Sequence, residues 1–300
     1  MTVEDDILAY FGADLARYVA NKHRGGLSGT RGTRYEDHFA VWVLARAAVA
    51  LIDDPSSNDP HMASQVSGFV DDLRVSSEAS TDYYQLKNAA TVSWTSGEHP
   101  IAKDFEHQFV LSGHRGEPAP RTHLIVSDPA LVEPLSARIP ESIRDHTSIA
   151  DFPWLETANR LVLTYAPLRE ILARLAHVEN PRDDTLAGVF YMLCSAYLET
   201  PRGDHVRSIL DRARGMFPGQ IRTFPISTAW EDALLPAFVA VLAGIQGLEY
   251  GAERGFFHWS GYGTQGVFGS DVTSDGFRTF QATVIDSRPS TFEAFEALLP

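Results

Sequence analysis

Two short segments of this sequence carry side chains whose types and spacing could do chemistry. One is Asp71-Asp72-Leu73 and the other is Tyr84-Gln85-Leu86-Lys87. The Asp72 carboxylate and the Gln85 amide oxygen are hard ligands that suit Mg²⁺ or Mn²⁺, and Glu36 could join them through water. A bound divalent cation lowers the pKa of a water ligand and neutralises charge on a phosphodiester. These residue types therefore predict metal-dependent phosphodiester hydrolysis, in which Lys87 positions or deprotonates the nucleophile.

Lysine is scarce in this chain, which gives each lysine more weight. Lys22, Lys87 and Lys103 are the only lysines among the 25 basic residues. Arginine stays protonated in proteins, whereas lysine is a compact charge whose pKa shifts readily. The alternative for Lys87 is a solvated lysine at a sheet edge beside a solvated Asp-Asp turn, and the scarcity of lysine favours the functional interpretation.

Other motifs lack the context that their chemistry needs. Gly261–Gly266 matches G-x-G-x-x-G, but a strand- or turn-like segment follows it where a dinucleotide site needs a helix N-terminus. The glycine-rich segment 24–32 lacks the Gly-Lys-Ser/Thr of a P-loop. His107 lies beside acidic residues on a short polar helix, where we expect a solvated face rather than a metal site. The single cysteine, Cys194, excludes a disulfide framework and a CxxC zinc site.

The candidate side chains need a β-hairpin beside a helix, and the sequence predicts both. Two strand-like segments, 64–75 and 82–88, flank a turn at 76–81, and strand alternation places Gln85 and Lys87 on one face. A helix over 35–52 carries Glu36 near its start. Flanking elements are expected as helices at 3–22, 101–111 and 130–138, a glycine-rich loop at 24–32 and a strand at 122–126. Together they predict an α/β domain over residues 1–150, with a small mixed sheet flanked by helices.

Residues 151–300 predict a second region that is mainly helical. Helices are expected at 161–175 with a kink at Pro167, and at 183–199, 203–216 and 228–248. From Arg254 the pattern changes to short strands rich in glycine and aromatic residues, followed by a closing helix at 292–299. We expect this region to serve oligomerisation or partner binding. The apolar stripe of its first helix is expected to be core, with a dimer or partner face as the alternative.

The order of these motifs resembles the PD-(D/E)xK nuclease superfamily. The resemblance covers residues 24–127 and is carried by the glycine-rich loop, Arg31-Gly32 ahead of Tyr35-Glu36, the helix, Asp71-Asp72-Leu73 and Tyr84-Gln85-Leu86-Lys87. It is similar to the nuclease domains of CBASS-associated and Lamassu-type anti-phage effectors, with the Gln-x-Lys variant of Mrr-like restriction enzymes. The resemblance implies a restriction-endonuclease-like fold, Glu36, Asp72 and Gln85 as Mg²⁺ or Mn²⁺ ligands, and Lys87 as the catalytic lysine. It also implies cleavage of double-stranded DNA in bacterial anti-phage defence.

The charge balance limits how the chain can contact nucleic acid. Lys and Arg total 25 against 39 Asp and Glu, a formal net charge of −14, whereas binding to phosphates needs cations. The stretch 17–34 is basic without acidic residues, and Arg24, Arg31 and Arg34 within it are candidates for phosphate contacts. We therefore expect weak intrinsic affinity for DNA and control by self-association or by an ATPase or sensor subunit of the same defence system.

Two alternatives stay open. An inactive nuclease-fold scaffold or regulatory subunit is favoured by Gln85, which replaces an acidic ligand, and by the charge balance. A stand-alone restriction endonuclease would instead cut DNA without a partner.

The N-terminal residues are acidic, and the longest apolar run of the chain is short. Both predict a cytoplasmic protein without a membrane-spanning segment.

Overall fold

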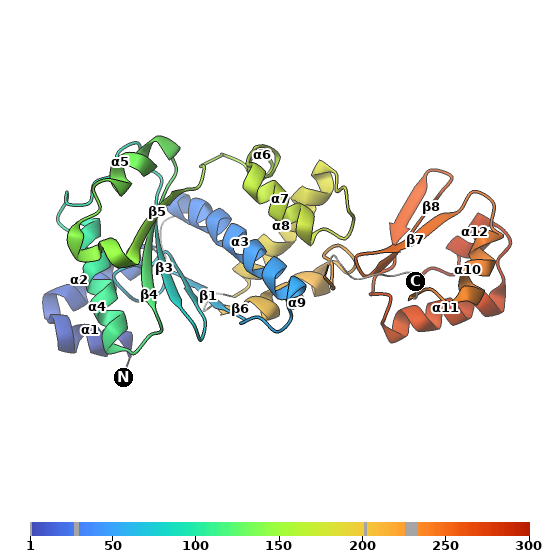
Figure 1. Cartoon of the computed structure of the whole chain (residues 1–300), viewed down its shortest axis with the longest axis horizontal. Coiled ribbons are helices and arrows are strands. Elements are labelled where there is room, and N and C mark those ends of the chain that lie inside the picture. Colours follow the sequence, from blue (N-terminus) through green and yellow to red (C-terminus); the bar gives the residue numbers. More distant parts are fainter. Residues whose placement is uncertain (1, 27–29, 201–202, 226–232) are drawn as a thin grey trace.

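A six-stranded mixed sheet with helices on both faces forms the first part of the chain (Figure 1). The computed structural model describes residues 2–26, 30–200, 203–225 and 233–300. The strands are β1 (His61–Ser64), β2 (Leu73–Ser76), β3 (Thr81–Lys87), β4 (Pro120–Val126), β5 (Thr147–Asp151) and β6 (Asp204–His205). They lie in the order β5-β4-β3-β2-β1-β6, in which β3, β4 and β5 are parallel and the other pairs are antiparallel. The expected α/β class with a mixed sheet is confirmed.

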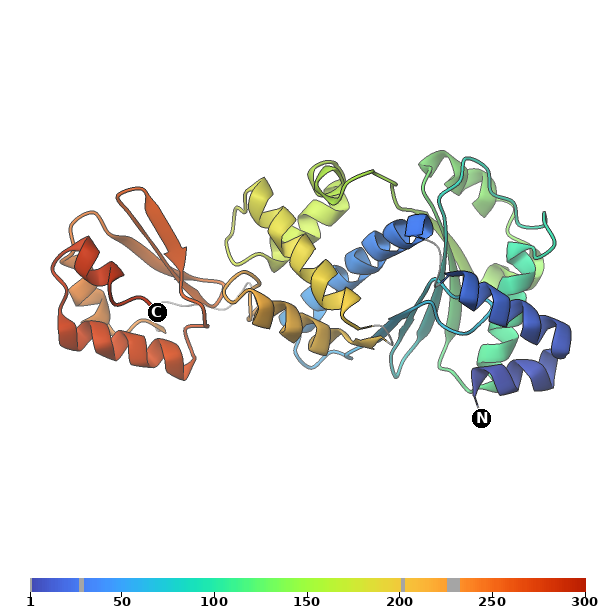
Figure 2. The same cartoon turned by 180° about the vertical axis from the view of Figure 1, so that it is seen from behind.

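The helices divide between the two faces of this sheet, as both views show (Figures 1 and 2). One face carries α1 (Val3–Phe11), α2 (Ala13–Gly26), α4 (Ile101–His114) and α5 (Val132–Ser136), with the 3₁₀ turns η1 (Pro129–Leu131) and η2 (Glu141–His146). The other face carries α3 (Thr30–Asp53), α6 (Ala158–Thr164), α7 (Ala166–Leu175), α8 (Asp183–Leu198) and α9 (Val206–Met216). Within the described residues, no helix is long and apolar enough to cross a membrane.

Alternate side chains of the central strands enter two separate cores. The core beside α3 takes Leu73, Leu86 and Ile125, and the core beside α4 takes Tyr83, Leu124 and Val126. Successive residues of a strand point to opposite faces, so the neighbours of Leu86 in β3, Gln85 and Lys87, lie on the α4 side. The hairpin and the shared face of these two side chains agree with the sequence interpretation.

The core beside α3 continues past residue 150. Helices α6–α9 pack around α3, and the apolar stripe of α6 and α7 lies in this core. Its leucines are fully buried and Tyr165 is partly buried. This stripe is therefore core. The expected boundary between residues 150 and 151 falls inside β5, whereas the large core ends at Ile221.

Residues 233–300 form a smaller C-terminal lobe with a core of its own, beyond α7–α9 from the main sheet (Figure 1). Its elements are α10 (Pro236–Ala243), β7 (Glu249–Glu253), β8 (Phe256–Gly261), β9 (Thr264–Val267), α11 (Asp275–Ser287) and α12 (Phe292–Glu296). The three strands form an antiparallel sheet. The G-x-G-x-x-G string is the β8–β9 hairpin, whose turn residues Tyr262 and Gly263 have positive φ. Its last three residues lie in β9 and a loop follows at 268–274, so the string lacks the helix of a dinucleotide site, as expected.

The expected strand over 64–75 is wrong. Two strands, β1 and β2, occupy its ends, and residues 65–72 form an irregular loop between them. The side-chain Oε1 of Gln108 accepts hydrogen bonds from the backbone N–H groups of Phe69 (3.0 Å) and Val70 (3.3 Å), which therefore need no neighbouring strand. Gly68 permits this contact, because a Cβ there would lie 2.8 Å from Gln108 Oε1.

Helix boundaries differ from expectation at several points. The helix expected at 3–22 is divided into α1 and α2 at Gly12, whose φ is +85°. The expected glycine-rich loop is largely helical, because α2 continues to Gly26 and α3 begins at Thr30, while residues 27–29 lie outside the described part. Pro167 lies in the first turn of α7 instead of kinking one helix. Helix α11 has no counterpart among the helices expected from the sequence. Of the helix expected at 228–248, residues 236–243 form α10, and residues 228–232 lie outside the described part.

Candidate active site

The end of the β2–β3 hairpin away from its turn brings Asp72 and Gln85 into direct contact. Leu73 is paired with Tyr84, so Asp72 lies opposite Gln85. The Oδ2 atom of Asp72 accepts hydrogen bonds from the backbone N–H of Leu86 at 2.6 Å and from Gln85 Nε2. Asp72 is 7% exposed and Gln85 is 4% exposed. Two strand ends thus fix a buried carboxylate next to a buried amide.

Lys87 and Glu36 lie close enough to Asp72 to act on its charge. The Lys87 ammonium stabilises the ionised Asp72 carboxylate, against the effect of its burial. Glu36 lies at the start of α3, and burial and repulsion from Asp72 raise its pKa. Gln65 holds Glu36 in place, with Nε2 donating to Glu36 Oε2 at 2.7 Å. Within the described residues, Lys87 Nζ forms no hydrogen bond or ion pair. The structure therefore gathers the four predicted residues at one end of the hairpin.

The carboxylates of this cluster hold their negative charge at a cost. Burial, followed by repulsion from Asp72 and Asp71, raises the pKa of Glu36 to about 7. Burial and the Asp71 charge likewise raise the pKa of Asp72 to about 6, against the opposing effects of Lys87 and the Leu86 N–H. A buried carboxylate whose pKa rises lacks full compensation of its charge. A cation bound here would supply that compensation.

The residues fit a divalent cation through a mixed carboxylate and amide donor set. Gln65 Oε1 is buried beside Glu36 without a hydrogen-bond partner in the described part of the chain, and oxygen is the donor that Mg²⁺ and Mn²⁺ prefer. Among described residues, no group of three or more His, Cys, Asp or Glu side chains could hold a metal ion by itself. A cation here would need amide as well as carboxylate oxygens.

Gln85 is oriented differently from the role that the sequence predicts for it. Its Nε2 faces Asp72, and its Oε1 accepts a hydrogen bond from Lys22 Nζ at 3.0 Å. As placed, Gln85 presents no oxygen to a cation held by Asp72. It instead fixes Asp72 by donating to it.

Sequence reasoning missed Lys22 and its acidic partners. Lys22 Nζ lies 3.2 Å from Asp71 Oδ1 and 3.4 Å from Asp104 Oδ2, and Asp104 also accepts a hydrogen bond from Tyr18 Oη at 2.8 Å. The expected solvated face of α4 is thus wrong, because Asp104 is buried and His107 packs on aromatic rings of α1 and the 65–72 loop. The scarcity of lysine, which singled out Lys87, applied equally to Lys22.

The three arginines predicted to contact phosphate are placed unevenly. Arg34 is exposed near the start of α3, two positions before Glu36. The side chains of Arg24 and Arg31 lie outside the described residues. Arg31 and Arg34 both lie on α3 with Glu36, and Arg34 is the one whose side chain is described.

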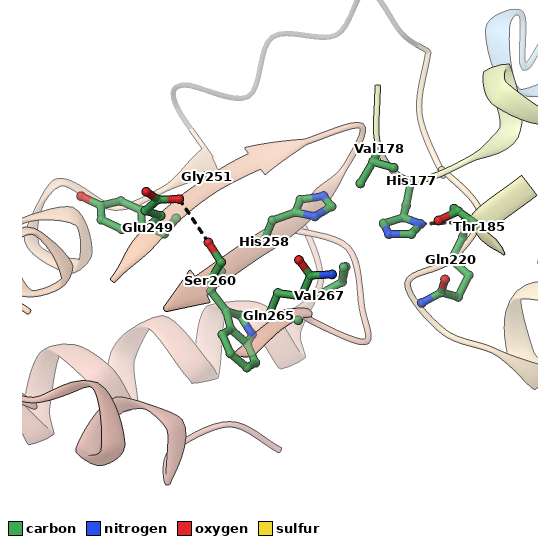
Figure 3. Close-up of a pocket in the computed structure, with 13 residues that line it drawn as sticks. His177, Val178, Thr185, Gln220, Glu249, Gly251, His258, Ser260, Gln265 and Val267 are labelled. Carbon is green, nitrogen blue, oxygen red and sulfur yellow. Dashed lines mark hydrogen bonds between the residues drawn. The ribbon is translucent and has the colours of Figure 1, made fainter. Parts of the chain in front are cut away.

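A hollow lies between the C-terminal lobe and the segments after α7 and α9 (Figure 3). It has a volume of about 530 Å³ and is lined by His177 on one side and by His258 and Ser260 of β8 on the other. The two imidazole rings are stacked with centroids 5.6 Å apart. Its described lining contains one carboxylate, that of Glu249, and no lysine or arginine.

Comparisons with protein-family models, with curated proteins and with solved structures find no match to this chain. The site consists of a buried and a half-buried carboxylate with raised pKa, two amide side chains that hold them, and two lysines. One lysine is enclosed by oxygen atoms and the other is without a partner in the described part of the chain.

Proposed function

We propose that this chain is a divalent-metal-dependent endonuclease that hydrolyses phosphodiester bonds of double-stranded DNA. The observation that carries the proposal is the meeting of Glu36, Asp72, Gln85 and Lys87 at one end of the β2–β3 hairpin. Incompletely compensated carboxylates favour a hard cation, and an unpaired ammonium beside them suits the negative charge of a phosphate. Both groups are needed at one place for metal-assisted hydrolysis.

The order of elements around the site supports the same proposal. Helix α3 precedes three antiparallel strands, β1 to β3, and helix α4 leads to the parallel strand β4. This is the order that a restriction-endonuclease-like core would have, with Asp72 before the second strand and Lys87 at the end of the third. We therefore propose that the fold belongs to this group.

The residues of the chain would divide the work of catalysis among them. A bound Mg²⁺ or Mn²⁺ would supply an activated water and neutralise phosphate charge. Glu36, Asp72 and Gln65 Oε1 would hold the ion, while Gln85 and the Leu86 N–H keep Asp72 oriented. Lys87 Nζ would bind the scissile phosphate group and hold a proton for the attacking or leaving oxygen.

Weak intrinsic DNA affinity is the second part of the proposal. The net charge of −14 opposes contact with a polyanion, and Arg34 is the one predicted phosphate contact whose side chain is described. We propose that a second copy of the chain, or a partner subunit of an anti-phage defence system, supplies the remaining affinity and brings the site to its substrate.

Replacement of Lys87 tests the proposed activity. We expect Lys87→Ala to reduce Mg²⁺-dependent cleavage of plasmid DNA by about 10²–10³-fold, because the charge that stabilises the reacting phosphate is lost. The matched control is Lys103→Ala, since Lys103 is exposed and paired with Glu106 on the outer side of α4. Circular dichroism and thermal unfolding of both variants would show that the fold is retained. Equal cleavage by Lys87→Ala and the wild type would contradict the proposal.

An inactive regulatory subunit is the competing proposal, and one contact favours it. Lys22 Nζ donates a hydrogen bond to Gln85 Oε1, and Gln85 is the residue at the position where the resemblance expects an acidic ligand. A subunit of this kind would protect cells from phage equally well with Lys87→Ala, whereas the enzyme would lose protection. A phage-infection assay in cells that carry the complete defence system therefore separates the two.

A further inference from the structure

The ammonium group of Lys22 is enclosed by four oxygen atoms next to the candidate active site. Two of them are neutral: the backbone oxygen of Phe69 at 2.6 Å and Gln85 Oε1 at 3.0 Å. The other two belong to carboxylates, Asp71 Oδ1 at 3.2 Å and Asp104 Oδ2 at 3.4 Å. The Lys22 side chain keeps 19% of its exposure. This set of carbonyl and carboxylate oxygens is the kind that holds hard cations in proteins.

The lysine is delivered to this cage by a helix whose position is fixed. Tyr18, one turn earlier in α2, donates from Oη to Asp104 at 2.8 Å. Val19 is buried in a small core with Ile7, Phe69 and Leu111, which joins α1, α2, the 65–72 loop and α4. Lys22 is therefore held in the cage by packing as well as by charge.

Lys22 also decides which atom Gln85 turns toward Asp72. With Oε1 bound to the ammonium, Nε2 faces the carboxylate, and both amide atoms meet a complementary group. Rotation of the amide by half a turn would place an NH₂ group against the ammonium. As long as Lys22 is in place, Gln85 is therefore a donor to Asp72 and not a metal ligand.

We propose that Lys22 is a built-in cation of this site, which occupies the position of a second divalent metal ion and positions Gln85. Two-metal sites use a pair of cations to compensate the charge that builds up in phosphodiester hydrolysis. Here one of the two charges is tethered to α2, and the site takes a single exchangeable ion at Glu36 and Asp72. This inference rests on the proposed metal-dependent function and specifies its metal stoichiometry.

The test is a titration of the full chain with Mn²⁺, followed by calorimetry and by the electron paramagnetic resonance signal of free Mn²⁺. We expect the wild type to bind one ion per chain and Lys22→Met to bind two, because the substitution leaves the cage oxygens without a cation. Lys103→Met is the matched control and should bind one ion, since Lys103 lies outside the cage on the exposed side of α4. Lys22→Met with Asp104→Asn should lose the added ion, because one cage carboxylate is gone.

Each result decides between failure of this inference and failure of the proposed function. Two ions bound by the wild type, or one ion bound both by the wild type and by a folded Lys22→Met, would overturn the role of Lys22 while leaving the nuclease possible. No ion bound by either protein would overturn both. No ion bound by the wild type and one by Lys22→Met would support the cage but contradict the proposed metal site. If Lys22→Met does not fold, Lys22→Gln keeps a hydrogen-bond donor, and Mn²⁺ should then raise its unfolding temperature more than that of the wild type. An equal rise would overturn the inference.

Discussion

At the scale of single residues, the site is a balance between buried carboxylates and two lysines. Asp71 and Asp104 have Lys22 as a partner, while Glu36 and Asp72 have amide and N–H donors and the nearby charge of Lys87. Removing a charge from water costs several kcal/mol unless a partner compensates for it. Glu36 and Asp72, which have no ion pair to a cation in the described residues, are therefore where an external cation would gain most, and the pair with Lys22 is where it would gain least.

The raised pKa values make a specific pH dependence of metal binding the expected result. Divalent ions bind ionised carboxylates, so a proton must leave Glu36, with a pKa of about 7, and Asp72, with a pKa of about 6. We expect Mn²⁺ affinity to rise steeply between about pH 5.5 and pH 7.5 and then to level off. Calorimetry in buffers of different ionisation enthalpy would show proton release that disappears at high pH.

The variant Glu36→Gln provides the internal comparison for this pH dependence. It removes the group with the higher pKa, so the remaining rise should move toward the lower pKa of Asp72, with weaker binding overall. For the metal-free protein, the stability of the fold changes with pH in the opposite direction to the affinity for Mn²⁺. A carboxyl with a raised pKa stabilises the fold fully below its ordinary pKa of 4.5 and loses that contribution as pH rises through about 7. An affinity for Mn²⁺ that does not change with pH would contradict the assignment of Glu36.

At the scale of elements, local pattern predicted the hairpin but not the loop that precedes it. The alternation around Gln85 and Lys87 is preserved because one side of β3 faces α3 and the other faces α4. Residues 65–72 also look strand-like, but Phe69 and Val70 enter two different cores and give their N–H groups to Gln108. That side chain is distant in sequence, so periodicity carries no trace of it.

The buried glutamine of α4 should be essential for the stability of this loop. Gln108 is 1% exposed, and replacement with leucine leaves the N–H groups of Phe69 and Val70 without an acceptor. Each unsatisfied buried donor costs about 1–3 kcal/mol, so we expect Gln108→Leu to lower the free energy of unfolding by at least that amount. Urea unfolding followed by circular dichroism measures the change.

A control on the same helix shows whether the loss is specific. Glu106→Gln alters a partly exposed side chain whose partner is the exposed Lys103. We expect it to change the free energy of unfolding by less than about 0.5 kcal/mol. Because the 65–72 loop leads directly into Asp72, Gln108→Leu should also weaken Mn²⁺ binding, and Glu106→Gln should not. Equal stability of the two variants would show that the loop has another support.

At the scale of the whole molecule, buried arginines join parts that sequence analysis treated separately. Arg222 is fully buried, pairs with Asp53 at the end of α3 at 2.7 Å, and donates to the backbone oxygen of Phe224 at 2.8 Å. Arg254, in the β7–β8 turn, donates to the oxygens of Ala173 and Ala176 at the end of α7. Sequence alone does not distinguish these buried arginines from exposed ones, because only the folded chain brings the helix ends that they contact close to them.

The same limit explains the division of the chain. A change of pattern near residue 150 suggested a boundary, yet α6–α9 complete the core around α3 and β6 extends the main sheet. Helices of one core and helices of the next share the same periodicity, so the pattern shows where apolar faces are but not which face they meet. Asp72, Gln85 and Lys87 could be predicted together from sequence because they belong to one local hairpin, whereas Lys22 and Gln65 meet them only through packing.

The contact between the C-terminal lobe and the rest of the chain should depend on pH through two histidines. His177 and His258 are stacked across the hollow of Figure 3, and burial lowers the pKa of both. The nearby charged groups are Glu253 at the end of β7, Arg254 in the β7–β8 turn and Glu179 after α7. Glu253 accepts a hydrogen bond from the Glu179 backbone N–H. The packed arrangement therefore favours neutral imidazoles.

Acid should accordingly separate the two lobes. Once the lobes part, both imidazoles regain their ordinary pKa of 6.5, so the open form takes up protons and the packed form becomes less stable as pH falls below that value. We expect the radius of gyration from X-ray scattering to increase between about pH 8 and pH 5.5 in the wild type. The double variant His177→Gln/His258→Gln should show a much smaller increase, while His114→Gln, which alters an exposed histidine of α4, should respond as the wild type does. Expansion of the double variant equal to that of the wild type would contradict the role of the two histidines. Glu253 would not account for it, because burial raises its pKa in the packed form and its protonation in acid therefore favours packing.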